Sequence, residues 1–513
     1  MRFNFSDYSQ VFDSMVLSET LSDMHSVGMV DDSLVLVEAL NTNIAMSVNT
    51  PYGATETIVL PAVVAQGDLL APLEASIQVD NIAKIQIIDE KSREQEEGST
   101  NLYKYLNKVS IPILGMMDDT ATVTEAGYKT EIMNAHIVTH TANKMLQFNS
   151  TKCKTMTISK SPDSVIIHDL KVDNWKVSHD INGVFSEEYA GKVGMKETTE
   201  HKYLGFVISS DASNVPNIIE KKGKVAGISR NIINITKGLG SYTFECVLIY
   251  LKSMIRGTTL NASETYYNMK EKEYRMLESY EEKLLIESLK TGVKCPRAIV
   301  YLDLGLCPAR FVVKKYKLNF LHHILNQQEE SLMFRFFKAQ MENPSKGDWV
   351  SEIRDWICDY EIAESFEEVK KMKKNHYEKI VNRKINTEAF VYLKSKIKSK
   401  GSSIKYGTNL EMQSYLKPNR VLTFQEQIKI FSYRSEMNEI SCNFRDLKKE
   451  EELCICKSIM NNTHLYHCKV INNGKDPKHN YEDLLNGTLH QQKYVLKIMK
   501  KNLEYFRKIT LAT

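Results

Sequence analysis

The 513-residue sequence contains no uninterrupted hydrophobic run of the length that a membrane-spanning helix requires. Its most apolar stretch, Ile58–Leu73, is interrupted by Gln66 and Asp68. The sequence also lacks the basic and apolar beginning that is typical of a secretory signal peptide. These absences predict an intracellular protein, in the nucleus or the cytoplasm, that has no membrane partner.

The sequence also lacks an internal repeat, a low-complexity segment and a regular cysteine framework. Its nine cysteines are odd in number and scattered, which fits a reducing compartment better than a set of disulfides. The remaining composition is that of an ordinary globular protein, with 42% apolar and 26% charged residues. A chain of this length is too long for one hydrophobic core, so we expect about two to four domains.

The net charge of +3 conceals an asymmetry along the chain. Residues 1–100 carry four Lys or Arg and sixteen Asp or Glu, a net charge of −12, so residues 101–513 carry +15. The stretch Glu367–Lys400 alone carries eleven basic and four acidic residues, a net charge of +7. This distribution is typical either of a polyanion-binding body next to a metal site or of ordinary solvated surfaces, and both interpretations stay open.

The most informative stretch is Ile111–Thr124, in which two adjacent carboxylates lie between two alternating runs. β-Branched residues at every second position predict strands, so we expect a β-hairpin with Asp118 and Asp119 at its tip. Neighbouring carboxylates repel each other and rarely serve packing. A divalent cation is the usual means of holding them together.

The beginning of the chain offers a third carboxylate. Alternating phenylalanines lead into Asp7, which predicts a short strand with this residue at its end, where side chains can converge on a ligand. A helical pattern then continues as far as Gly28. The pair Asp31-Asp32 resembles the central pair, but we interpret it as a loop before a strand at Ser33–Val37.

Further patterns predict more strands and then a long helical region. Two alternating runs flank residues 51–53, a Pro-Tyr-Gly sequence that is typical of a hairpin turn. A turn at Asn149 is expected to lead into another strand, and Lys202–Ile208 is predicted to be one strand with a bulge at its glycine. From about Asn217 onward helical spacing prevails, with Met269–Leu289 as a clear amphipathic helix.

Four soft metal ligands occur close together near the C-terminus: Cys454, Cys456, His464 and Cys468. Cysteine and histidine in such a short span are typical of zinc sites. The Cys-x-Cys spacing differs from the usual Cys-x-x-Cys pair, so the sequence leaves open whether the four residues bind Zn²⁺ or no metal.

Five short motifs lie in order along residues 1–210. They are Asp7 followed by Phe12-Asp13, the pair Gln66-Gly67, Met116-Met117-Asp118-Asp119, Asn149 with Lys152, and Tyr203-Leu204-Gly205. In residue types, order and spacing these motifs resemble those of reverse transcriptases of the non-LTR retrotransposon type. Met116 departs from the pattern, because the family usually has an aromatic residue there.

The resemblance implies an α+β fold that begins with a polymerase palm, an antiparallel sheet packed on helices, over residues 1–215. It implies an all-α thumb and connection over residues 216–420 and a helical C-terminal region with the Cys/His cluster over residues 421–513. Because only six residues precede Asp7, we expect the chain to be truncated and to lack the basic fingers and the N-terminal endonuclease of such elements.

The resemblance also implies the catalytic residues. Asp7, Asp118 and Asp119 would hold two Mg²⁺ ions, one activating the attacking 3′ oxygen and one holding the triphosphate. Lys152 would neutralise or protonate the leaving pyrophosphate.

By the same resemblance, Tyr8, Gln66 and Gly67 would bind the nucleotide and template, and Tyr203, Leu204 and Gly205 would form the primer grip. The expected function is that of an RNA-directed DNA polymerase, which extends a DNA primer on an RNA template with dNTPs. The alternatives are an inactive nucleic-acid-binding remnant without fingers, an unrelated two-metal nuclease, and a domesticated interaction protein that does not depend on Mg²⁺.

Overall fold

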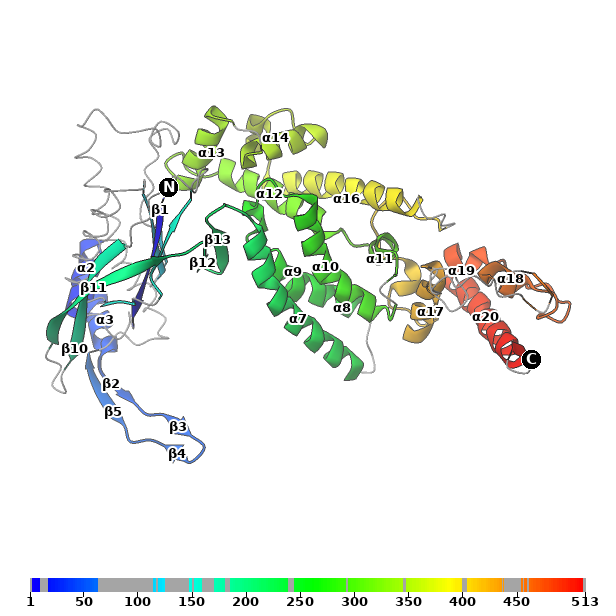
Figure 1. Cartoon of the computed structure of the whole chain (residues 1–513), viewed down its shortest axis with the longest axis horizontal. Coiled ribbons are helices and arrows are strands. Elements are labelled where there is room, and N and C mark those ends of the chain that lie inside the picture. The colour runs from blue at the N-terminus through cyan, green and yellow to red at the C-terminus, as the bar shows by residue number, and fades with distance from the viewer. Residues whose placement is uncertain are drawn as a thin grey trace. The chain divides into compact units, whose positions relative to one another are not determined.

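The computed structural model of the chain has a mixed α+β fold, as the sequence predicts, and consists of two compact units (Figure 1). Unit 1 comprises Met1–Asn217 and Glu330–Asn343, and unit 2 comprises Ile218–Glu329 and Pro344–Thr513. The structure describes residues 2–9, 17–62, 114–116, 119–124, 147–149, 152–158, 170–179, 185–238, 244–291, 294–344, 347–398, 404–435, 437, 454, 456–458 and 461–510.

A seven-stranded sheet organises unit 1, with β1 (Arg2–Ser9) near its middle. The strand order is β10 (Leu170–His179), β11 (Phe185–Glu197), β9 (Lys154–Thr157), β1, β7 (Asp119–Thr124) and β6 (Leu114–Met116), while β8 (Gln147–Phe148) pairs with β1. The neighbouring strands are antiparallel except β11 and β9, which are parallel.

The two faces of β1 are built differently because successive residues of a strand point to opposite sides. Phe5 packs with Ala121 and Met156 in the buried core of one face. Asn4, on the other face, donates from Nδ2 to Thr122 Oγ1 at 3.3 Å and accepts from Thr155 Oγ1 at 2.9 Å. A one-residue slip of either neighbour would break this buried polar chain, so it helps to fix the register of three strands.

The hairpin predicted within residues 111–124 is present as β6 and β7. Leu114 pairs with Ala121 and Met116 pairs with Asp119. Met117 and Asp118 connect the two strands and lie outside the described residues.

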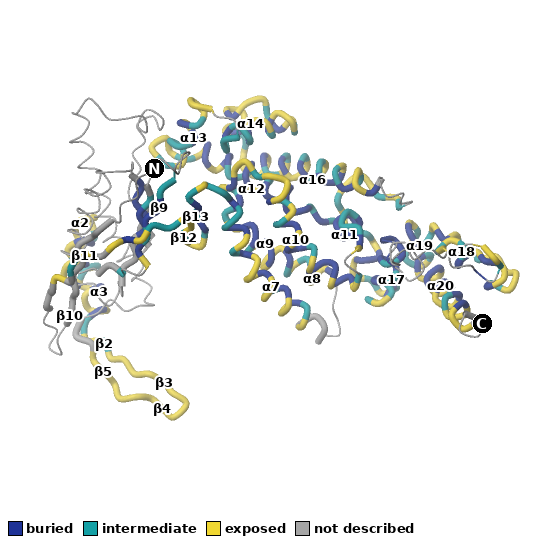
Figure 2. Tube along the Cα trace, in the orientation of Figure 1, coloured by how far each residue is buried: buried dark blue, intermediate teal, exposed yellow. Residues whose placement is uncertain are grey.

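The hairpin predicted around residues 51–53 is also confirmed. β2 (Thr42–Met46) pairs with β5 (Ile58–Ala62), and β3 (Asn49–Thr50) pairs with β4 (Gly53–Ala54). Gly53 has φ +119°, a backbone conformation that favours glycine. This β2–β5 arm is mostly exposed along its length (Figure 2).

The strand predicted at Ser33–Val37 is wrong, because these residues belong to a helix. α3 (Asp31–Asn41) follows α2 (Leu17–Ser26), and Met24 and Val37 are buried together between them. The acidic pair that was interpreted as a loop forms the first turn of α3, where negative charge is favourable against the helix dipole.

The single bulged strand predicted at Lys202–Ile208 is also wrong. β12 (Glu200–Tyr203) and β13 (Phe206–Ser209) form a hairpin of their own. The two residues between them, Leu204 and Gly205, have φ +48° and +80°. Two successive positive φ angles make the tight turn that matches the twist of a hairpin, so the glycine marks a chain reversal and not a bulge.

From α7 (Val215–Gly238) onward the described chain is helical, as predicted from about Asn217. The predicted helix at Met269–Leu289 is α10 (Glu271–Ser288). α13 (Leu332–Glu342) belongs to unit 1. The other helices are α8 (Phe244–Tyr250), the π-helical turn Leu251–Ile255, α9 (Arg256–Thr259), α11 (Arg297–Asp303), α12 (Ala309–Leu325), α14 (Trp349–Asp359), α15 (Phe366–Lys371), α16 (Lys374–Lys398), α17 (Phe424–Arg434), α18 (Asn462–His467), α19 (Glu482–Asn486) and α20 (Leu489–Thr510).

Buried ion pairs connect the helices of unit 2. The carboxylate of Asp303, at the end of α11, accepts from Nε and Nη2 of Arg434 on α17 and from the hydroxyls of Tyr406 and Tyr415. Arg434 Nη1 also donates to the carbonyl of Leu485 on α19. The Asp303–Arg434 ion pair and its hydrogen bonds therefore join segments from residue 303 to residue 485. In the part of the chain that the structure describes, no helix has the length and apolar character needed to cross a membrane.

Candidate functional site

Two of the three predicted catalytic carboxylates lie on neighbouring strands. Asp7 comes near the end of β1, and Asp119 is the first residue of β7. In the antiparallel register of these strands their Cα atoms are direct partners. Asp118 immediately precedes Asp119 in the chain and lies outside the described residues.

The turn that carries Lys152 lies at the same end of the sheet. Tyr8, the residue after Asp7, is the register partner of Phe148 in β8. The backbone N–H groups of Lys152 and Cys153 both donate to the carbonyl of Asn149, at 3.1 and 3.0 Å, and close the predicted turn before β9. The Lys152 side chain is exposed. Backbone pairing alone therefore brings three of the five motifs to one end of the sheet. They are the motifs that contain Asp7, Asp119 and Asn149 with Lys152.

The hairpin that carries the predicted primer-grip residues packs on the Phe5 face of β1. The rings of Phe5 and His201 are stacked with centroids 4.1 Å apart, and Tyr203 lies 5.9 Å from Phe5. Leu204 and Gly205 form the exposed turn. The remaining predicted pair, Gln66 and Gly67, falls outside the described residues.

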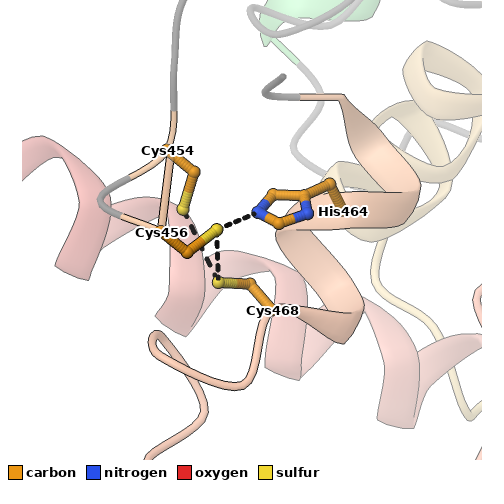
Figure 3. A group of neighbouring side chains, drawn as sticks. All are labelled: Cys454, Cys456, His464 and Cys468. Atoms are coloured by element: carbon orange, nitrogen blue, oxygen red, sulfur yellow. Dashed lines mark hydrogen bonds between the residues drawn. The ribbon is translucent and has the colours of Figure 1, made fainter. Parts of the chain in front are cut away.

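A second site lies in unit 2, where the four predicted zinc ligands are gathered (Figure 3). One ligand atom from each of Cys454, Cys456, His464 and Cys468 lies within 4.8 Å of all the others. The Sγ atoms of Cys454 and Cys468 are 3.5 Å apart, and that of Cys456 is 3.8 Å from Cys468 Sγ and 3.2 Å from His464 Nε2. Four ligands around one zinc ion at about 2.3 Å would place two sulfurs about 3.8 Å apart, so the cluster could hold one metal ion.

Local backbone structure explains how a Cys-x-Cys pair supplies two converging ligands. The N–H of Cys454 donates to the carbonyl of Ser458 at 2.8 Å, and the N–H of Lys457 donates to the carbonyl of Cys454 at 2.7 Å. Lys457 adopts φ +68°, which closes the loop tightly. The short spacing is thus compensated by a tight turn after the second cysteine.

The other two ligands come from one helical turn. His464 is on α18 and Cys468 caps its C-terminal end, four residues later, so both lie on the same side of the helix. Asn461 caps the N-terminus by accepting from the N–H of His464 at 2.7 Å. Asn502 of α20 donates to the carbonyl of Leu465 at 2.9 Å and so ties α18 to the longer helix.

The thiols of the cluster differ electrostatically. Burial raises the pKa of Cys454 to about 12. Hydrogen bonds from the side chain and backbone of Ser458 lower the pKa of Cys456 to about 6. A metal ligand must be a thiolate, and Cys456 is already favoured in that form.

Sequence analysis did not identify the residues that support this site. Asn502 is 2% exposed and also donates to the side chain of Asn472 at 3.0 Å. The only sequence signal is that a polar residue interrupts the apolar face of α20. Asn461, three residues before His464, has the ordinary pattern of a helix cap and could have been found.

No family model matches the chain, and no curated protein matches it.

Proposed function

We propose that the chain is an RNA-directed DNA polymerase, of the type that retrotransposons encode. The observation that carries the proposal is the register pairing of Asp7 with Asp119. Residues directly opposite each other on antiparallel strands lie on the same face of a sheet. Two aspartates far apart in the sequence are thus register partners near one end of the sheet, and Asp118 immediately precedes Asp119 in the chain.

The residue types at this end of the sheet suit Mg²⁺, which prefers carboxylate oxygens. Asp7, Asp118 and Asp119 would hold the metal, and bound Mg²⁺ would help to deprotonate the primer hydroxyl and neutralise the triphosphate. Like-charged carboxylates repel one another, so a grouping of these three side chains would favour a function over a packing role.

The other motifs would position the substrates. The exposed Lys152, in the turn after β8, supports a role in neutralising the pyrophosphate that leaves. Tyr8 would lie beside the nucleotide, with Gln66 and Gly67 next to the template. The hairpin that carries the Tyr203–Gly205 turn packs on the sheet face that carries Phe5, and its turn would contact the primer strand.

Primer extension with the full chain tests this proposal. We expect incorporation of dNTPs on an RNA template with Mg²⁺, and a loss of at least 100-fold in Asp119→Asn. Asp32→Asn is the matched control, because it alters an exposed Asp-Asp pair in the first turn of α3 and should keep full activity. Equal activity in both variants, or none in the unaltered chain, would refute the polymerase; degradation of the template without dNTPs would favour a two-metal nuclease.

A second candidate function is nucleic-acid binding without polymerisation, supported by the Cys/His cluster. We propose that the cluster binds Zn²⁺, since three sulfurs and one imidazole nitrogen make a donor set that zinc prefers. α18 packs on α20, whose exposed surface carries six basic side chains and one acidic: Lys493, Lys497, Lys500, Lys501, Arg507, Lys508 and Glu504. Such a surface suits a phosphate backbone.

Gel-shift titration with single-stranded RNA tests the second function, in the absence of dNTPs. We expect binding that weakens with salt and falls at least fivefold in the double variant Lys497→Gln, Lys501→Gln. Retention of binding together with inactivity in primer extension would identify a binding protein. Unchanged binding in the double variant would exclude this surface.

A further inference from the structure

A cavity of about 800 Å³ lies within unit 2, away from the Cys/His cluster in sequence. It is formed where α10, the beginning of α11, the beginning of α12, α16 and the end of α17 converge. Ligand sites in proteins are commonly cavities of about 300–1,000 Å³ with apolar walls and a few polar groups. Nothing in the proposed polymerase or zinc chemistry uses this cavity.

The polar lining of the cavity is predominantly cationic. Five basic side chains line it against two carboxylates: Arg275, Arg297, Arg310, Lys396 and Arg434, with Glu278 and Glu282. Two further carboxylates do not line the cavity but pair with its arginines: Glu271 with Arg310 and Asp303 with Arg434. The five basic and four acidic groups together carry a net charge of +1 when all are ionised. Burial raises the pKa of Glu282, and the nearby Arg297 opposes this rise.

Two of the arginines are fixed parts of the wall. Arg310 donates from Nε and Nη2 to Glu278, at 2.5 and 2.8 Å, and its other bonds go to Glu271. Arg434 is held by Asp303. These pairs are buried and would not reorganise for a ligand.

The other three cationic side chains are more exposed than Arg310 and Arg434. Arg275 pairs with the half-exposed Glu271, and its own side chain is 71% exposed. Arg297 pairs with Glu282 at 3.2 Å and is partly exposed. Lys396 is exposed on α16 and its Nζ lies 5.2 Å from the centre of the Tyr392 ring. Exposed ion pairs contribute little energy, so the Arg275 side chain can turn to an incoming anion at small cost, as can the exposed Lys396. Arg297 is held in place, because its Nη1 also donates to the carbonyl of Cys295 at 2.9 Å.

The remainder of the lining is suited to a flat ring. Ile299, Leu393 and Ile397 supply aliphatic surface, together with two prolines. The ring of Tyr392 has two cations near it, with Arg310 Cζ at 5.0 Å and Lys396 Nζ at 5.2 Å from its centre. A free inorganic anion would gain nothing from the aliphatic wall, and an uncharged ring would form no ion pair with the cations.

We infer that this cavity binds a 5′-nucleotide, with its phosphate at Arg275, Arg297 and Lys396 and its base between Tyr392 and the aliphatic wall. This inference goes beyond the polymerase proposal and does not depend on it, since no residue of unit 1 takes part. The same chemistry could be supplied by a free mononucleotide or by the phosphorylated 5′ end of an oligonucleotide.

Calorimetric titration of the full-length Asp119→Asn variant with adenosine 5′-monophosphate tests the inference without any contribution from polymerisation. We expect saturable binding, with adenosine alone and inorganic phosphate alone each at least tenfold weaker. Displacement of the nucleotide by a 5′-phosphorylated oligonucleotide, and not by the unphosphorylated one, would identify the polymer end as the source. Displacement by neither oligonucleotide would identify the free nucleotide.

Two lysines of the same helix provide a matched comparison. Lys396→Met should weaken nucleotide binding at least fivefold. Lys394→Met should leave it unchanged, because Lys394 lies over the Phe390 ring and does not line the cavity. Ile397→Trp should fill the cavity and abolish nucleotide binding, while its melting temperature stays equal to that of the unaltered chain. No binding at millimolar nucleotide, equal effects of the two lysine variants, or phosphate binding as tightly as the nucleotide would overturn the inference.

Discussion

The guanidinium of Arg434 and the carboxylate of Asp303 are 2.7 Å apart in the interior of unit 2, and both side chains are almost fully buried. Two tyrosine hydroxyls complete the coordination of the carboxylate. A buried pair of this kind is not automatically stabilising, since both charges lose their hydration. Removing only one partner, however, leaves the other charge buried and unpaired.

The first prediction concerns this pair. Asp303→Ala should lower the free energy of unfolding of unit 2 by about 3–5 kcal/mol, because Arg434 then remains charged in the interior. The double variant Asp303→Leu, Arg434→Met should be less destabilised than the single variant. Chemical denaturation measures both, and Arg275→Ala, at an exposed pair, should cost less than about 1 kcal/mol.

The second prediction concerns the pH dependence of stability. Lys221 is buried and donates to the carbonyl of Asn261 at 2.7 Å and to Tyr266 Oη at 3.0 Å. Burial lowers the pKa of Lys221 from 10.5 to about 8. The unfolded chain therefore holds a proton between pH 8 and 10.5 that the folded chain has released, so this group contributes stability that increases as the pH rises through that window.

Lys221→Met removes this titration. The difference in unfolding free energy between the unaltered chain and the variant should shift in favour of the unaltered chain as the pH rises from 8 to 10. Lys222→Met, at the exposed neighbouring lysine of α7, should show no such trend. A constant difference across the range would contradict the prediction.

The third prediction concerns metal content. The purified chain should carry about one zinc per molecule, and Cys468→Ala should lose it, as measured by elemental analysis. Chelation should lower the melting temperature of the unaltered chain, because a bound metal stabilises the folded state. Cys358→Ala removes an exposed cysteine of α14 and should leave zinc content and melting temperature unchanged. Zinc in equal amounts in both cysteine variants would exclude the cluster.

The fourth prediction concerns the turn between β12 and β13. Leu204 has φ +48°, a conformation that costs a leucine more than an asparagine. Leu204→Asn should stabilise unit 1 by about 0.5–1 kcal/mol, since Asn-Gly is the preferred sequence of this turn type. Leu204→Val should destabilise it. If Leu204→Asn lowers primer extension, the turn contacts the primer. An unchanged free energy of unfolding in Leu204→Asn would show that the turn is not strained.

Sequence patterns predicted those elements whose signal is local. The alternating runs gave the hairpin around residues 51–53, and amphipathic spacing gave α10. The Leu-Val run at Ser33–Val37 was assigned to a strand because a short apolar run has no decisive period, and packing against α2 selected a helix. The Lys202–Ile208 hairpin was missed because a leucine occupies a position that usually holds asparagine or glycine.

The same holds for the candidate sites: features with a local sequence signal could be predicted, and contacts between distant segments could not. The zinc ligands were visible from residue type, but the tight turn at Lys457 that makes their spacing workable was not. The register partners Asp7 and Asp119 were brought together only by the motif resemblance, because no local pattern relates two strands so far apart. The cavity of unit 2 had no signal, since its walls come from five separate segments.

The Asp303 carboxylate also has a consequence for synthesis on the ribosome. Its guanidinium partner follows 131 residues later in the chain. At about 5–20 residues per second, roughly 7–26 s separate the translation of the two residues. During that interval the carboxylate of Asp303 has no guanidinium partner, and burying it unpaired would be costly. We therefore expect the centre of unit 2 to stay open to water until α17 emerges from the exit tunnel.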